Sequence, residues 1–246
     1  MWKVPRNVAN GAVDLILPSA CWLCSEPTSG QPFCDRCEQA LTDEPSPVCP
    51  RCASSLSEAT AAANICPRCD QQSFAYDSVV RLGPYAGALR EAILRMKKPS
   101  GEMFAEAAVD VFARHMLPRL RNRAFDSVIP IPLHWWRRLR RGYNQSELLA
   151  GAMAKSIGTP LLSRVLRRIR RTQLQSQLTA EERRTNVRGA FAPRAKTNLS
   201  GKSVLLVDDV LTSGATAHEA ARVLRSLGAK AIVVAVLAHE SPRKRE

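Results

Sequence analysis

Eight cysteines, all before residue 70, form four Cys-x-x-Cys pairs: Cys21/Cys24, Cys34/Cys37, Cys49/Cys52 and Cys66/Cys69. One such pair grips a tetrahedral metal ion from a tight turn, and a second pair completes a four-thiolate site. Eight thiolates therefore predict two structural zinc ions, with every cysteine a ligand. The pairs are separated by 9, 11 and 13 residues, which favours two successive ribbons and leaves a cross-braced order open.

Two other kinds of cysteine chemistry fit this pattern less well. A disulfide framework is typical of secreted proteins, but the amino-terminal stretch carries Asp14 and lacks a signal-peptide core. A thioredoxin-like site needs one pair beside a strand–helix unit, not four pairs in series. Residues 21–72 also hold few large apolar side chains, so zinc would supply folding free energy that the thin core lacks.

A second candidate site lies in VLLVDDVLTSGAT, residues 204–216. The acidic pair Asp208 and Asp209 follows an apolar strand and offers two acceptors for vicinal hydroxyls. The next residues lead into a helix, where unpaired backbone amides and hydroxyl groups favour a phosphate. A ribose 5-phosphate fits this order of groups. The phosphate-loop residues are Thr212, Ser213, Gly214, Ala215 and Thr216. A magnesium site of receiver or phosphatase type is the alternative, and the P-loop pattern is absent.

Basic residues predict an anionic partner. The chain carries a net charge of +14, and residues 134–194 hold 14 Lys and Arg against 3 Glu, a net +11. Arginine suits bidentate contacts with phosphate, although a solvated basic face remains the alternative. The candidate pyrophosphate or anion ligands fall in three groups: Lys97 and Lys98 after a helix; Arg137, Arg138, Arg140 and Arg141 in a loop after a strand; and Arg183, Arg184 and Arg188 in a polar segment that is either a mobile cover or a solvated helix.

Alternating strands and helices must position these groups. From residue 74 onwards, apolar patterns predict strands at 74–82, 127–133, 202–210 and 231–238. Helices are predicted at 87–97, 102–117, 145–157 and 215–227. Such alternation predicts a mostly parallel sheet with helices on its faces, whose ligands bind at the carboxyl ends of the strands. We expect a double zinc-ribbon domain with a short N-terminal helix over residues 1–72 and the α/β domain over 73–246.

Several of these segments resemble known families. VLLVDDVLTSGAT resembles the phosphoribosyl-pyrophosphate (PRPP) motif of type I phosphoribosyltransferases. PIPLHWWRRLRRGYNQSELLA (130–150) and QSQLTAEERRTNVRGAF (175–191) are similar to the ComF family of competence proteins, as is a double zinc ribbon. The resemblance implies that Asp208 and Asp209 bind the ribose hydroxyls, that residues 212–216 bind the 5-phosphate, and that Mg²⁺ accompanies PRPP.

Three hypotheses about function follow. The first is a phosphoribosyltransferase, a glycosyltransferase that moves the sugar to an acceptor. The second is a protein that binds PRPP without turnover. The third is a binder of single-stranded DNA, because arginines stand beside Trp135 and Trp136; the resemblance implies work in natural competence and DNA uptake, with competence or DNA-processing proteins as partners. No apolar run reaches the ~18–20 residues of a membrane span, so we expect a cytoplasmic protein.

Overall fold

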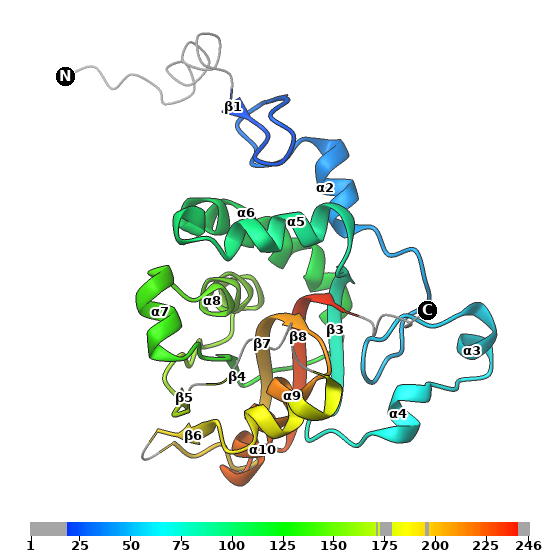
Figure 1. Cartoon of the computed structure of the whole chain (residues 1–246), viewed down its shortest axis with the longest axis vertical. Coiled ribbons are helices and arrows are strands. Elements are labelled where there is room, and N and C mark those ends of the chain that lie inside the picture. The colour runs from blue at the N-terminus through cyan, green and yellow to red at the C-terminus, as the bar shows by residue number, and fades with distance from the viewer. Residues whose placement is uncertain (1–18, 171, 173–178, 195–196, 241–246) are drawn as a thin grey trace.

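The computed structural model describes residues 19–170, 172, 179–194 and 197–240 (Figure 1). The expected short N-terminal helix lies outside the described residues. Within the described part of the chain, no helix is both long and apolar enough to cross a membrane.

Four parallel strands form the central sheet, in the order β3 (Ser78–Pro84), β8 (Ala231–His239), β7 (Ser203–Leu211) and β4 (Ser127–Pro130). Val204 and Leu206 of β7 enter the apolar cluster on one face, and Leu205 and Val207 enter the cluster on the other. This alternation is the ordinary consequence of strand geometry. Because helices cover both faces, the inner strands are continuously apolar over residues 204–207 in β7 and 231–238 in β8, and the predicted mostly parallel α/β sheet is confirmed.

The two faces carry different helices. One face is covered by α5 (Gly87–Met96), α6 (Glu102–Met116) and α8 (Gln145–Ile157), with Leu89, Phe104 and Leu149 buried in the apolar cluster on that face. The other is covered by α10 (Ala215–Ser226), against which α9 (Ala180–Val187) packs. Short 3-10 turns, η1 (Pro99–Gly101) and η2 (Leu117–Leu120), precede and follow α6.

The first cysteine-rich unit packs against α6 on the face covered by α5, α6 and α8. It contains β1 (Ser19–Ala20), β2 (Pro27–Thr28) and α2 (Asp35–Thr42). Phe33 is 1% exposed, and its ring lies 5.9 Å from that of Phe104 and 6.2 Å from that of Phe112. The second unit contains α3 (Glu58–Ala62) and α4 (Pro67–Gln71) and precedes β3.

Three predicted elements differ from the structure. The strand expected at 127–133 ends at Pro130, because Ile131 makes the last bond to Val207 (2.8 Å) and Pro132 has no N–H to donate. The cationic loop expected at 137–141 is a helix, α7 (Trp135–Arg141). Residues 74–77 precede β3 rather than belong to it. The antiparallel pair of β5 (Leu166–Arg168) and β6 (Phe191–Pro193) was not predicted.

Candidate functional site

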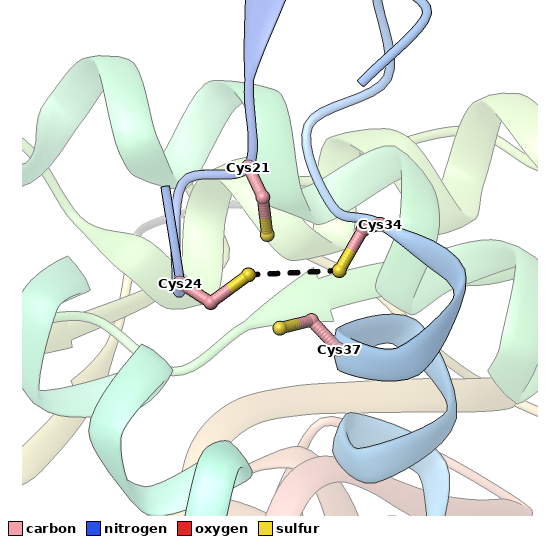
Figure 2. Close-up of side chains that lie close together, drawn as sticks. All are labelled: Cys21, Cys24, Cys34 and Cys37. Atoms are coloured by element: carbon pink, nitrogen blue, oxygen red, sulfur yellow. Dashed lines mark hydrogen bonds between the residues drawn. The ribbon is translucent and has the colours of Figure 1, made fainter. Parts of the chain in front are cut away.

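The cysteines form two four-sulfur groups. Cys21, Cys24, Cys34 and Cys37 make one group and Cys49, Cys52, Cys66 and Cys69 the other, with the sulfurs of each group within 4.8 Å of one another. Figure 2 shows the first group, in which the four side chains point toward one centre and the sulfurs of Cys24 and Cys34 lie 3.6 Å apart. The pairs therefore combine in chain order, and the cross-braced order is excluded.

The chemistry of each group fits a structural zinc ion. Four thiolates that converge from two knuckles are the usual closed site. Burial favours the neutral thiol of Cys21, but hydrogen bonds from the backbone at Cys24 and Cys34 outweigh it and lower its pKa to about 6. In the same group, burial and the neighbouring thiols raise the pKa of Cys37, so binding of a zinc ion by all four sulfurs would release protons.

The acidic pair lies where β7 loses a neighbour. β4 pairs with β7 only as far as Val207. Asp208 and Asp209 therefore lie beyond the part of β7 that β4 covers. Ser146 Oγ donates to Asp208 Oδ1 at 2.9 Å, and the backbone N–H of Asp209 donates to the same oxygen at 2.9 Å. Burial, then the charge of Asp209, raises the pKa of Asp208 to about 7.

Two cations accompany this pair. Lys97, directly after α5, places its Nζ 3.0 Å from Asp209 Oδ2. Burial lowers the pKa of Lys97, but the charge and hydrogen bond of Asp209, together with the charges of Tyr85 and Asp208, outweigh burial and the net pKa is raised. Burial lowers the pKa of Arg141, and the charge of Asp209 offsets part of that effect. Arg141 Nη1 also donates to Gln145 Oε1 at 2.6 Å.

A network at the start of α8 holds these cations. Gln145 Nε2 donates to the carbonyl of Met96 at 2.6 Å, and the Tyr143 hydroxyl donates to the same carbonyl. Met96 is the last residue of α5 and precedes Lys97. The end of α5 and the start of α8 are therefore tied together beside the acidic pair.

The turn after β7 is built for close approach. Gly214 has φ +75° and precedes α10, a helix of 12 residues. Its conformation is one that residues with a Cβ rarely adopt. The hydroxyl of Ser213 is buried and has no hydrogen-bond partner among the described residues. A cavity of about 420 Å³ opens beside this turn, lined by Phe74, Arg188, Ser213, His218 and Glu219, among others.

The other predicted cations have surroundings of their own. Lys98 is exposed, and so is Arg140 on α7. Arg138 Nη2 pairs with Glu147 Oε2 at 3.3 Å. Arg188 is exposed and lines the cavity, and Arg183 is half-buried on α9. The side chains of Arg137 and Arg184 lie outside what the structure describes.

Sequence reasoning assigned no role to three residues near these groups. Ser146 bonds Asp208, and its only sequence signal is its place in the YNQSELLA stretch. Arg68 and Tyr76 lie against Gly214: a Cβ added to that glycine would stand 3.0 Å from Arg68 Nη2 and 2.7 Å from the Tyr76 hydroxyl. Nothing in the local sequence separates Arg68 from Arg51, which occupies the same place in an identical Cys-Pro-Arg-Cys knuckle.

Comparison with known proteins matches both halves of the chain. Residues 144–246 match the phosphoribosyl transferase domain family, and residues 12–73 match the double zinc ribbon domain family. The latter match, with the two four-sulfur groups, supports structural zinc.

Relatives extend over most of the chain. Competence protein F of Haemophilus influenzae is 31% identical over 82% of this chain and 88% of its own length. DNA utilization protein YhgH of Salmonella typhimurium is 30% identical over 89% of this chain and 96% of its own. Competence protein ComFC of Bacillus subtilis is 25% identical over 76% of this chain and 81% of its own.

Proposed function

The chain belongs to the family of competence protein F and DNA utilization protein YhgH, and from that premise we propose that it binds PRPP with Mg²⁺ and serves DNA uptake or utilization. The proposal includes a cytoplasmic location, where thiols stay reduced and able to bind zinc. It also includes DNA-processing or competence proteins as partners.

One observation carries the PRPP part of the proposal. An acidic pair, a turn that can bind phosphate and two cations meet at the carboxyl end of β7. Asp208 and Asp209 precede the turn at Gly214, and Lys97 pairs with Asp209. PRPP offers two ribose hydroxyls between a 5-phosphate and a pyrophosphate. Its groups match that order of acceptors and donors.

Each residue group has a distinct task in this proposal. Asp208 and Asp209 accept hydrogen bonds from the ribose hydroxyls, and Ser146 holds the Asp208 carboxylate in place through its 2.9 Å bond. Residues 212–216 donate to the 5-phosphate with backbone and hydroxyl groups. Lys97 and Arg141 attract the pyrophosphate. Mg²⁺, when bound with PRPP, supplies positive charge that stabilises the departing pyrophosphate.

Calorimetric titration with PRPP and Mg²⁺ tests the proposal. Asp208→Asn together with Asp209→Asn removes the charged acceptors and keeps the shape of the strand. Loss of a hydrogen bond to a charged group costs roughly 1.5–3 kcal/mol, so PRPP affinity should fall at least about tenfold. Asp126→Asn is the matched control, because Asp126 is exposed and pairs with Lys202 (3.0 Å) instead. Unchanged PRPP affinity in the double variant would refute the assignment.

Pyrophosphate release separates an enzyme from a PRPP sensor. The wild-type chain, incubated with PRPP, Mg²⁺ and a panel of acceptors, should release pyrophosphate if the sugar is transferred. The Asp208→Asn, Asp209→Asn chain is the blank for each acceptor. If PRPP binds but releases no pyrophosphate in the presence of any acceptor of the panel, the result favours the sensor.

A second candidate function, binding of single-stranded DNA, has its own support. On α7 the side chains of Trp135 and Trp136 are 65% and 44% exposed, and Arg138 and Arg140 are exposed beside them. Exposed aromatic rings among arginines favour base stacking and phosphate contact. Both functions involve α7, because Arg141 ends this helix beside the acidic pair while the two tryptophans face solvent, and one chain can perform both.

A further inference from the structure

The second zinc group contains two identical knuckles whose arginines point to different surroundings. Cys49-Pro50-Arg51-Cys52 and Cys66-Pro67-Arg68-Cys69 have the same sequence. Arg51 is exposed, whereas Arg68 is half-buried, with its terminal nitrogen Nη2 fully buried. Because the two knuckles have the same sequence but only Arg68 is buried, we infer that Arg68 has a role in the interior that Arg51 lacks.

Among the described residues, the Arg68 guanidinium forms no salt bridge with a carboxylate. Within the described residues it lies over the ring of Phe74 at 5.4 Å, contacts His239 Nε2 through Nη1, and approaches Ser54 Oγ at 3.5 Å. Among the same residues, Nη2 has no hydrogen-bond partner. The thiolates of the second zinc group lie nearby and supply negative charge, but a buried guanidinium nitrogen without an acceptor is still costly, and a bound anion would offset that cost.

Unpartnered polar atoms gather at the turn before α10. Arg68 Nη2 and the Tyr76 hydroxyl lie on the Cβ side of Gly214, at 3.0 and 2.7 Å from where a Cβ would stand. Tyr76 is 1% exposed, and its hydroxyl, like that of Ser213, has no partner in the described part of the chain. Burial raises the pKa of Tyr76, so its hydroxyl keeps its proton. The helix amino terminus adds backbone donors at the same place.

We propose that Arg68 supplies the fixed positive charge at the phosphate end of the site, and that zinc in the second four-cysteine group sets phosphate affinity by holding Arg68 against Gly214. This inference rests on the proposed PRPP function. Arg68 is a positioning and charge-supplying residue: it contacts the turn rather than the reacting atoms. The zinc ribbon thus completes the phosphate site of the other half of the chain.

The ligand that this charge selects is the sugar 5-phosphate rather than the pyrophosphate. Lys97 and Arg141 lie beside the acidic pair, at the end of the site proposed for pyrophosphate. Arg68 lies at the turn that follows the acidic pair, against Gly214. Two groups of cations therefore serve the two ends of PRPP.

Calorimetry with three probes tests the inference: PRPP, ribose 5-phosphate and inorganic pyrophosphate, each with Mg²⁺. Arg68→Ala should lower the affinity for PRPP and for ribose 5-phosphate at least about tenfold, as for the loss of a charged partner. The affinity for pyrophosphate should stay unchanged. Arg68→Lys should recover most of the ribose 5-phosphate affinity, because it keeps the charge. Arg51→Ala, the matched knuckle control, should leave all three affinities unchanged.

The zinc part has its own variant. Cys66→Ser should lower the zinc content from two equivalents to about one. It should also lower the affinity for ribose 5-phosphate as much as Arg68→Ala does. Cys24→Ser in the first group should also lose about one equivalent of zinc and keep ribose 5-phosphate affinity. Unchanged affinity in Cys66→Ser at one equivalent of zinc overturns the zinc part.

Other outcomes separate this inference from the proposed function. Wild-type affinity for ribose 5-phosphate in Arg68→Ala overturns the role of Arg68 while PRPP binding by the wild type stands. Equal losses for pyrophosphate and ribose 5-phosphate also overturn it, since they indicate a general distortion. A wild-type chain that binds ribose 5-phosphate but not PRPP overturns the proposed function, and the ribose 5-phosphate measurements then decide on Arg68 alone.

Discussion

The carboxyl of Asp208 combines two opposing effects. Burial and the neighbouring Asp209 disfavour its charge and raise its pKa to about 7, while the bonds from Ser146 and the Asp209 backbone favour the charge. Burial and the charge of Asp209 outweigh these bonds, so the pKa of Asp208 is raised. A protein that used this carboxylate only for stability would gain more from a neutral side chain at the same position.

Asp208→Asn should therefore stabilise the protein at alkaline pH. The folded-state pKa lies above the ordinary value near 3.9, so the stability tied to the protonated carboxyl is full below about pH 4 and is lost as pH rises through about 7. Because asparagine stays neutral, the variant should exceed the wild type by about 1–3 kcal/mol at pH 8 and match it near pH 4. Urea unfolding at several pH values measures this difference. A gain that persists at pH 4 would contradict it.

Lys97→Met should shift the pH dependence of PRPP binding. PRPP affinity should rise with pH through about 7, as Asp208 loses its proton and becomes a better acceptor. Lys97 lowers the pKa of Asp208, so removing its charge should move this midpoint upward and weaken PRPP about tenfold. Calorimetry across pH measures both effects. Lys98→Met is the control, since Lys98 is exposed; an equal loss in that variant would refute the specific role of Lys97.

Local and distant residues of the site differ in how well sequence predicts them. Asp208, Asp209 and the turn at Gly214 lie within one stretch, so a strand pattern and residue types suffice to group them. Ser146 lies 62 positions away from Asp208 and reaches it only because α8 packs beside β7. Its bond depends on tertiary packing that no local pattern contains.

At the scale of elements, α7 shows how a short helix escapes prediction. Its seven residues, Trp135–Arg141, carry repeated positive charges that disfavour a helix in isolation. The His134 side chain accepts from the N–H of Trp136 at the amino end, and Gly142 at φ +90° ends the helix. Two end residues thus decide the structure of a run that composition alone favours as a loop.

The exposed face of α7 should bind single-stranded DNA. Trp135→Ala with Trp136→Ala should cost about 1–3 kcal/mol in affinity because the bases can no longer stack on the rings. Arg138→Ala with Arg140→Ala should lower the slope of log affinity against log salt by about 0.7 for each DNA phosphate that the variant no longer neutralises. Fluorescence anisotropy with a labelled oligonucleotide, at several salt concentrations, measures both.

An exposed arginine outside α7 serves as the control for the proposed DNA-binding face of α7. Arg121→Ala removes an exposed charge that follows η2 and should leave the slope nearly unchanged. Equal slopes in all variants would mean that α7 is only a solvated basic face. PRPP affinity should stay unchanged in the tryptophan variants, because these side chains are exposed and only Arg141 of α7 is assigned to the PRPP site.

At the scale of the whole molecule, the alternation of strands and helices in the sequence predicts the architecture of the sheet. It does not predict how the zinc ribbon packs on that sheet. The parallel sheet, its helices and the ComF-family resemblance were predicted and are confirmed. The β5–β6 pair was missed, because strands of three residues carry too few alternating positions to detect. The boundary at residue 72 stays a prediction. Phe33 shares a buried cluster with Leu205 of the sheet, and a contact of that kind leaves no trace in local sequence.

Metal analysis should find about two equivalents of zinc per chain. The reason is the convergence of eight sulfurs into two groups of four. Removal of zinc by a strong chelator should lower the thermal midpoint and expose apolar surface, because metal binding and folding are coupled in such ribbons. Atomic emission and dye binding measure the two effects. One equivalent or less, in protein purified without chelator, would contradict the assignment.

The packing of Phe33 also limits how this chain can be divided during evolution or in the laboratory. A gene shortened to begin after the first ribbon would leave the rings of Phe104 and Phe112 without the side chain that covers them. Newly exposed aromatic surface promotes association between molecules. The ribbon and the sheet are therefore expected to be inherited as one unit, and a lineage that discards the cysteines must first replace the apolar residues of that helical face with polar ones.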